Sequence, residues 1–260
     1  MTETTAPGVE PRPLTEQSVL VLGGTSGIGR AIAAAFRAEG ASVAIAGRDE
    51  GRGIEAAEAL GATFIACDAA EPVAVEAMTA SAEAALGRID TLVISTGGAR
   101  LPELLFRQSL EDIRVGLTQD LAPFLYAARA VLPGMMREGR GTILSIASDA
   151  GKVATPGEAV IGAGMAAIIQ FTRTLAMEAK RNGVRANVIT PSLVEGTPLT
   201  DRLMEEGRFS AKLFAKARPL AALGPTEVSD IAALALFLAS PAARRITGQA
   251  ISVNGGISAA

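Results

Sequence analysis

The stretch Gly23-Gly24-Thr25-Ser26-Gly27-Ile28-Gly29 decides the fold of this chain. It follows an apolar run, Ser18–Leu22, and opens a helical stretch from about Gly27 to Glu39, which Gly40 ends. A glycine-rich turn between a strand and a helix lets the backbone approach a pyrophosphate, whose charge the helix N-terminus stabilises. The alternative is that these glycines merely permit tight packing of strand on helix. The residues expected to bind a dinucleotide here are Gly23, Thr25, Ser26, Gly27, Ile28 and Gly29.

Short runs rich in Val and Ile alternate with Ala-rich helical stretches along the rest of the chain. Strands are predicted at Ser18–Leu22, Ser42–Ala46, Thr63–Ala66, Thr91–Ser95, Thr142–Ile146, Arg185–Ile189 and Ala250–Val253. Further helices are predicted at Gly51–Leu60, Val73–Leu86, Ser109–Met136 (kinked at Pro123), Glu158–Arg181 and Glu227–Ala239. Fully apolar strands that alternate with helices predict a parallel sheet covered on both faces. The expected fold is therefore α/β, a Rossmann-type doubly wound parallel sheet of about seven strands with ligands at the carboxyl ends of the strands.

The chain of 260 residues fits one domain over residues 14–260. Residues 1–13 are polar and hold three prolines, so we expect a disordered N-terminal tail, and no linker, repeat or second domain follows it. A net charge of −3 gives no reason to expect a nucleic acid or an acidic membrane as partner. No apolar run approaches the roughly 18 residues of a membrane span.

Two residue counts limit the chemistry further. The single cysteine, Cys67, excludes an internal disulfide and fits the reducing cytoplasm, where we expect the protein to act. The absence of histidine excludes His-based triads, His general bases and His-bearing zinc sites, and we expect no metal.

Two charged residues follow the next strands of the predicted sheet. Gly47-Arg48 ends the second strand, where the adenosine ribose would lie, and an arginine there suits a 2′-phosphate and so favours NADP. The alternative is a solvated arginine. Asp68 follows the third strand, and it would either accept a hydrogen bond from the adenine amino group or cap the turn before Pro72.

Further motifs, in chain order, resemble the short-chain dehydrogenase/reductase family over about residues 14–256. They are Cys67-Asp68, Ser145-Ile146-Ala147-Ser148, Asn187 with Thr190-Pro191, Thr247-Gly248-Gln249 and Val253-Asn254-Gly255-Gly256. The resemblance implies that Thr197 touches the nicotinamide amide and that Gly97 closes the cofactor turn after the fourth strand. It implies that Ser148 positions the substrate oxygen. The stretch from Ile146 to Gly151 also resembles members that oxidise cyclic hydroxyacyl-CoA compounds.

The chain departs from the family where the chemistry takes place. Ile161, thirteen residues after Ser148, stands where the family has its proton-transferring Tyr, and Met165 stands at the position of its Lys. Neither side chain can transfer a proton or carry a charge. Asp120 occupies the position of the family's Asn, and the remaining catalytic candidates are Ser148 and Asp120. Tyr126, the only tyrosine, is six residues from Asp120, so helical geometry turns it away from that position.

These departures predict a catalytically impaired subunit that supports an active relative of the same family in a hetero-oligomer. The long helices would form the interface, a tetramer is expected, and the complex would act on a hydroxyacyl-CoA. NADP or NAD would then bind weakly or not at all. Two alternatives stay open: an NAD(P)-dependent oxidoreductase with a non-standard proton donor, and a dinucleotide-responsive binding protein. A different reaction that uses Ser148, Asp120 or Asp149 also stays open, as does a purely structural role for Asp120.

Overall fold

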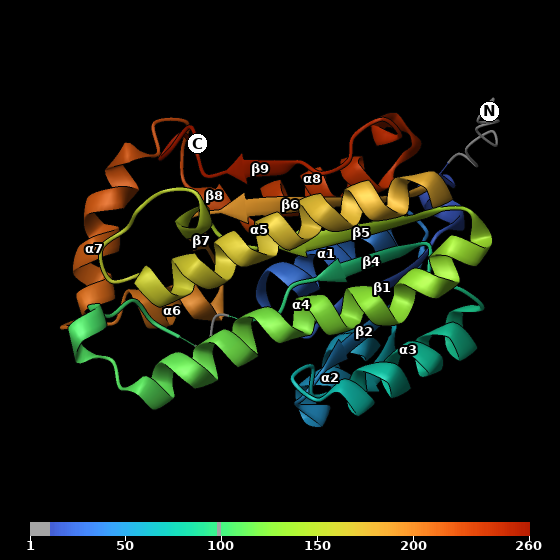
Figure 1. Ribbon diagram of the computed structural model, residues 1–260, viewed down its shortest axis with the longest axis horizontal. Helices are drawn as coiled ribbons and strands as arrows, with labels where there is room; N and C mark the ends of the chain where they lie inside the picture. Colours follow the sequence, from blue (N-terminus) through green and yellow to red (C-terminus); the bar gives the residue numbers. More distant parts are fainter. Residues whose placement is uncertain (1–10, 98–99) are drawn as a thin grey trace.

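The computed structural model describes residues 11–97 and 100–260, and Figure 1 shows a parallel sheet between two layers of helices. The seven-stranded sheet has the order β3-β2-β1-β4-β5-β6-β9. Its strands are β1 Ser18–Leu22, β2 Ser42–Gly47, β3 Thr63–Ala66, β4 Thr91–Ile94, β5 Gly141–Ile146, β6 Val184–Pro191 and β9 Ala250–Val253. The chain adds strands outward from β1 to β3 and then returns to place β4 beside β1. The strand order therefore reverses between β1 and β4, where α/β sheets bind their ligands.

The helices cover both faces of this sheet. They are α1 Gly27–Ala38, α2 Glu50–Leu60, α3 Pro72–Leu86, α4 Leu110–Glu138, α5 Ala159–Ala179 and α8 Val228–Ala239. One buried apolar cluster joins the sheet to α3, α4 and α5, and a second joins its other face to α1, α2 and α8. Figure 1 shows α4 and α5 running side by side across the front of the sheet. The predicted doubly wound fold is confirmed.

The long helix α4 is fixed at its start by local sequence. The Ser109 hydroxyl accepts a hydrogen bond from the Asp112 backbone at 3.0 Å, and the Asp112 carboxylate accepts one from the Ser109 backbone at 3.2 Å. This reciprocal pair satisfies two N–H groups of the first turn. The helix continues through Pro123 and Pro133 and ends at Glu138, and the residue that caps it, Gly139, has a φ of +67°.

The structure differs from the sequence expectations in two places. The edge strand β3 is not fully apolar, since Thr63 and Ala66 at its two ends are exposed. The stretch between β6 and α8 forms helices α6 Pro198–Leu203 and α7 Phe209–Ala217 and a two-stranded sheet of β7 Val194–Glu195 and β8 Thr226–Glu227. None of these four elements was predicted, because each is short and carries no long apolar period.

The predicted N-terminal tail lies mostly outside the described residues, which begin at residue 11. The Arg12 carbonyl accepts a hydrogen bond from Gln17 Nε2 at 2.8 Å, so defined contacts begin just before residue 14. One helical segment, residues 159–182, is long and apolar enough to cross a membrane by length and composition. It consists of α5 and a short 3-10 turn, and Ile168, Thr172 and Ala176 are among the α5 residues buried inside the protein. Residues 159–182 therefore behave as a core helix.

Candidate dinucleotide and reaction site

A pocket of about 190 Å³ lies at the carboxyl ends of β1, β2, β3 and β4, at the point where the strand order reverses. Its wall includes the loop after β1, the ends of β2 and β3, the turn after β4 and one face of α4. The predicted residues that it brings together are Gly23, Thr25, Ser26, Arg48, Asp68, Gly97 and Asp120.

The glycines after β1 are required by close approaches of the backbone. A Cβ atom on Gly23 would lie 2.2 Å from the Ser95 carbonyl oxygen, and one on Gly29 would lie 2.2 Å from the Gly23 carbonyl oxygen. Gly23 also has a φ of +85°, which L side chains rarely adopt. The Ser26 side chain makes no capping hydrogen bond at the start of α1, so it leaves the first N–H groups of that helix for a ligand. These features fit a pyrophosphate.

Two arginines flank the end of β2, where the adenosine ribose would lie. Arg48 is exposed and lines the pocket, and Arg52 lines it from the first turn of α2. Asp49 caps that helix by accepting a hydrogen bond from the Arg52 backbone at 3.0 Å, which brings Arg52 back beside the strand end. The sequence interpretation missed Arg52, although a capping Asp directly after Arg48 could have indicated it. Together these guanidinium groups suit a 2′-phosphate.

Cys67 and Asp68 line the pocket at the end of β3, where the adenine of a dinucleotide would lie. Asp68 lines the pocket and its Oδ1 accepts a hydrogen bond from the Ala70 backbone at 3.1 Å. It therefore caps its turn, one of the two roles considered for it, while one carboxylate oxygen stays available. Burial, with the nearby Asp68 charge, raises the pKa of the Cys67 thiol to about 11, so this thiol is protonated at neutral pH.

Four predicted cofactor residues do not line the pocket: Gly27, Ile28, Gly29 and Thr197. Ile28 packs its side chain into the apolar cluster under α1, and Gly27 adopts a φ of +51° at the start of that helix. Thr197 is buried, with its Oγ1 accepting a hydrogen bond from the Thr200 backbone at 3.1 Å. A Cβ atom on Gly27 would lie 3.7 Å from the Thr197 Cβ, so the structure does bring Thr197 against the glycine loop.

Asp120 is the buried one of the two acidic residues that line the pocket, and its side chain is 7% exposed. Arg100 Nε lies 3.8 Å from Asp120 Oδ2, an ion pair without a hydrogen bond. Burial raises the pKa of the Asp120 carboxyl, and the Arg100 charge partly lowers it. Nearby, the Thr96 hydroxyl is buried and has no hydrogen-bond partner among the described residues. An acid with a raised pKa and an unpartnered hydroxyl in one pocket are typical of a functional site.

Ile161 and Met165, which stand at the positions of the family's Tyr and Lys, lie among apolar side chains in the structure. Met165 is buried in the cluster between the sheet and α5, and Ile161 packs against the same cluster. Ser148 does not line the pocket. Its Oγ accepts a hydrogen bond from the Ala150 backbone at 3.2 Å at the start of a 3-10 turn, Asp149–Gly151. That turn presses on α5, since a Cβ atom on Gly151 would lie 2.7 Å from the Met165 carbonyl carbon.

Asp149 connects the turn Asp149–Gly151 to the C-terminal segment through hydrogen bonds. Its buried carboxylate accepts hydrogen bonds from Ser252 Oγ at 3.0 Å, from Ser258 Oγ at 2.9 Å and from Asn254 Nδ2. Lys152 Nζ lies 3.9 Å from the same carboxylate, and burial lowers the pKa of this lysine. Asp149 therefore holds the turn Asp149–Gly151 against the C-terminal segment.

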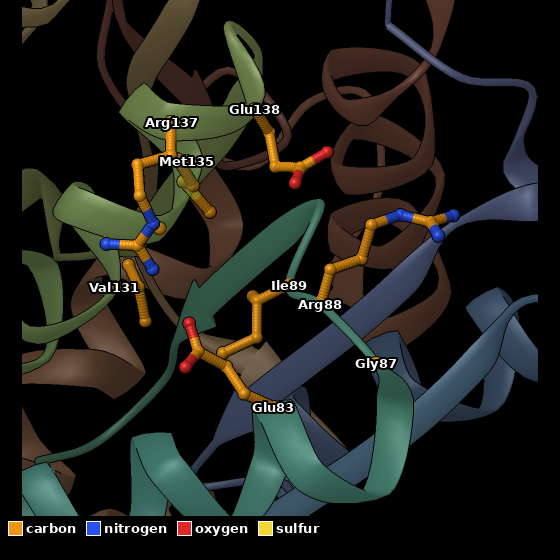
Figure 2. Close-up of a pocket in the computed structure, with 9 residues that line it drawn as sticks. Glu83, Gly87, Arg88, Ile89, Val131, Met135, Arg137 and Glu138 are labelled. Carbon is orange, nitrogen blue, oxygen red and sulfur yellow. The ribbon is translucent and has the colours of Figure 1, made fainter.

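A second depression, of about 130 Å³, lies at the amino ends of the strands, far from the pocket. Figure 2 shows the Glu83 carboxylate and the Arg137 guanidinium pointing toward each other across it. Gly134 leaves room for both, because a Cβ atom there would lie 2.8 Å from Glu83 Oε1. Its charges are balanced by residues of opposite sign within the depression. Among residues 11–97 and 100–260, no group of three His, Cys, Asp or Glu side chains could hold a metal ion.

Comparisons with known proteins agree with this geometry. Residues 23–258 match the family described as enoyl-(acyl carrier protein) reductase. The 3-oxoacyl-[acyl-carrier-protein] reductase of Synechocystis sp. is 34% identical, over 94% of this chain and 98% of that protein. The 2-dehydro-3-deoxy-L-rhamnonate dehydrogenase (NAD(+)) of Sphingomonas sp. is 33% identical, over 91% and 93%. The crystal structure of gox2181 superposes with a TM-score of 0.84 at 27% identity, over 94% of this chain and 98% of that one.

Proposed function

Because this chain belongs to the short-chain dehydrogenase/reductase family, we propose that it is an NAD(P)-dependent oxidoreductase in which Asp120 takes the proton-transfer role. The observation that carries this proposal is the buried Asp120 carboxyl, whose pKa is raised inside the pocket at the strand-order reversal. The relatives that share the fold over nearly their whole length are named as reductases and dehydrogenases. Asp120 supplies a carboxyl at the position where the family resemblance implies an asparagine.

The proposed chemistry is the interconversion of a carbonyl and an alcohol. A bound nicotinamide would supply or accept the hydride. A carboxyl whose pKa is raised by burial can donate its proton to the substrate oxygen during reduction and take it back during oxidation. Burial keeps the proton affinity of Asp120 high. The family resemblance implies that Ser148, at the start of the turn Asp149–Gly151, positions the substrate oxygen.

The cofactor proposed is NADP, bound mainly through its adenosine half. Arg48 and Arg52 would hold the 2′-phosphate, the glycine loop the pyrophosphate, and Asp68 the adenine. Met165 removes the charged contact to the nicotinamide ribose that the family resemblance implies, so we expect weaker binding on that side. The proposed substrate is a 3-oxoacyl thioester, the class named for several relatives, and the proposed compartment is the cytoplasm.

The test is the oxidation of NADPH by the purified chain with acetoacetyl-CoA as substrate. Asp120→Asn should lower the turnover rate by about 10²- to 10⁴-fold, the usual contribution of a positioned acid. Glu111→Gln is the matched control, because Glu111 lies exposed on the same helix and should leave the rate unchanged. Equal rates in wild type and Asp120→Asn would refute the role of Asp120.

A second candidate is the catalytically impaired subunit of a hetero-oligomer with an active relative. Two observations favour it: Met165 is buried among apolar residues, and an exposed apolar surface surrounds the start of α4, at Phe106, Leu110 and Leu117. Native mass spectrometry after co-expression with an active relative is the test. Mixed oligomers, together with no turnover by this chain alone, would favour this candidate over the oxidoreductase.

A further inference from the structure

Arg100 lies across helix α4 at a position that only glycine permits. A Cβ atom on Gly116 would lie 1.9 Å from Arg100 Nε and 2.1 Å from its Cζ, so the guanidinium occupies the space over this residue. The Arg100 side chain is only 19% exposed. Glycine in a helix interior lowers helix stability by about 1 kcal/mol relative to alanine. Gly116 therefore weakens α4 at the residue on which Arg100 packs.

The same face of α4 carries two carboxylates around Gly116. Residues 112, 116 and 120 are four apart and therefore line up along one side of the helix. Arg100 Nε lies 3.8 Å from Asp120 Oδ2. The Arg100 guanidinium lies over Gly116, which is between the two acids on this face. The pKa of Asp112 is lowered mainly by its hydrogen bonds with Ser109 and further by the Arg100 charge.

The other groups that face Asp120 are neutral. Gly97, from the turn after β4, and Gly164, from α5, approach it without side chains: Cβ atoms there would lie 3.7 Å from Asp120 Oδ1 and 3.9 Å from its Cβ. Within the described part of the chain, the charge acting on the Asp120 carboxyl is that of Arg100.

We propose that Arg100 is a positioning residue of the reaction, which supplies the positive charge that sets the protonation and orientation of Asp120 and replaces the cation missing at Met165. The inference rests on the proposed proton-transfer role of Asp120. An opposite charge within 4–6 Å favours the ionised carboxylate, whereas burial favours the neutral acid. With both effects present, the carboxyl can release and recover its proton, as an acid–base group must. Arg100 reaches the site from the turn after β4, a different element from the one that carries Met165.

The decisive measurement is the titration of the Asp120 carboxyl by carbon-13 NMR, with its signal identified by its loss in Asp120→Asn. Arg100→Gln should move the midpoint to higher pH, and Arg100→Lys should restore it toward wild type. Gly116→Ala should produce the same upward shift with both charges still present, because its Cβ displaces the guanidinium. Gly134→Ala in the same helix is the control, since its Cβ meets only the mobile end of Glu83 and Arg137 and should leave the midpoint unchanged.

The NMR titration does not need turnover, so its result separates the two proposals. In an active enzyme, the pH dependence of kcat should follow the same shifts. An unmoved midpoint in Arg100→Gln and Gly116→Ala would overturn the role of Arg100 even if the enzyme were active. If the midpoint moves but no variant, wild type included, reduces any carbonyl, the proposed oxidoreductase function fails and a positioning role in that reaction fails with it.

Discussion

Replacing Arg48 by alanine should weaken the binding of NADP and leave the binding of NAD unchanged. Arg48 is exposed at the end of β2 and forms no ion pair with another described residue, so its guanidinium is available to a 2′-phosphate. Arg52 stands beside it, held by Asp49 at 3.7 Å with both side chains about half exposed. Such an exposed pair contributes at most about 1 kcal/mol, so Arg52 can turn to the phosphate at little cost.

The magnitude follows from the strength of an arginine–phosphate contact. A hydrogen bond to a charged group contributes about 1.5–3 kcal/mol, and solvent screening at this exposed edge favours the lower value. Arg48→Ala should therefore raise the Kd for NADP by about tenfold. Removing Arg52 as well should raise it by about a hundredfold if the two contacts add.

Calorimetric titration with NADP and with NAD at fixed ionic strength measures this effect. Arg114→Ala is the control, because Arg114 is an exposed arginine on α4 away from the pocket. It pairs with Glu111 three residues away, as Arg52 pairs with Asp49. Equal weakening of NADP and NAD, or no change in either, would refute the assignment of the β2 end to a 2′-phosphate.

Three further predictions follow from the same structure. Burial, opposed in part by Arg100, raises the pKa of Asp120, so the stability linked to this group is present below its ordinary pKa of 3.8 and is lost as the pH rises through the folded value. Asp120→Asn should therefore raise the Tm at pH 8 but not at pH 3, as measured by differential scanning fluorimetry. Equal shifts of the Tm at both pH values would contradict this prediction. Ile161→Tyr with Met165→Lys returns the family's Tyr and Lys, so turnover of acetoacetyl-CoA should survive Asp120→Asn in that background. The buried lysine should lower the Tm of this variant. If the double variant depends on Asp120 as much as the wild type does, the restored pair does not replace Asp120 and the prediction is wrong. The Asp90 carboxylate accepts hydrogen bonds from the Ser18 backbone and Arg88 Nε, both at 2.9 Å, and it also faces Arg12 and Arg140. Asp90→Ala should therefore lower the free energy of unfolding, measured by urea denaturation, by about 3 kcal/mol. A loss below about 1 kcal/mol would contradict a structural role for this cluster.

The sequence predicted the sheet and its main helices because their apolar runs are long and regular. All seven strands of the main sheet lie within one or two residues of the predicted ranges, and the glycine turn after β1 forms the expected pocket wall. The elements between β6 and α8 were missed, since α6 has only six residues and β7 and β8 have two each. Segments this short are fixed by contacts with the rest of the fold, such as the packing of Phe214 on Leu193 and Leu203, which no local pattern reveals.

The candidate site was predictable in its backbone and not in its charges. Gly23, Arg48 and Asp68 lie within two residues of strand ends, so their convergence was a consequence of parallel strand order. The Arg100–Asp120 pair joins residues twenty positions apart, in a turn and in a helix, and their approach depends on the missing side chain of Gly116. Neither the raised pKa of Asp120 nor the full engagement of Asp149 could be read before the burial of both groups was known.

The segment that follows β9 supports the loop that carries Ser148. Ser258 Oγ and Asn254 Nδ2 both donate hydrogen bonds to the carboxylate of Asp149, which directly follows Ser148. A substitution at Asn254 or Ser258 would therefore act on that loop, although both residues are distant from it in sequence. Activity should be sought in protein that keeps both residues unaltered.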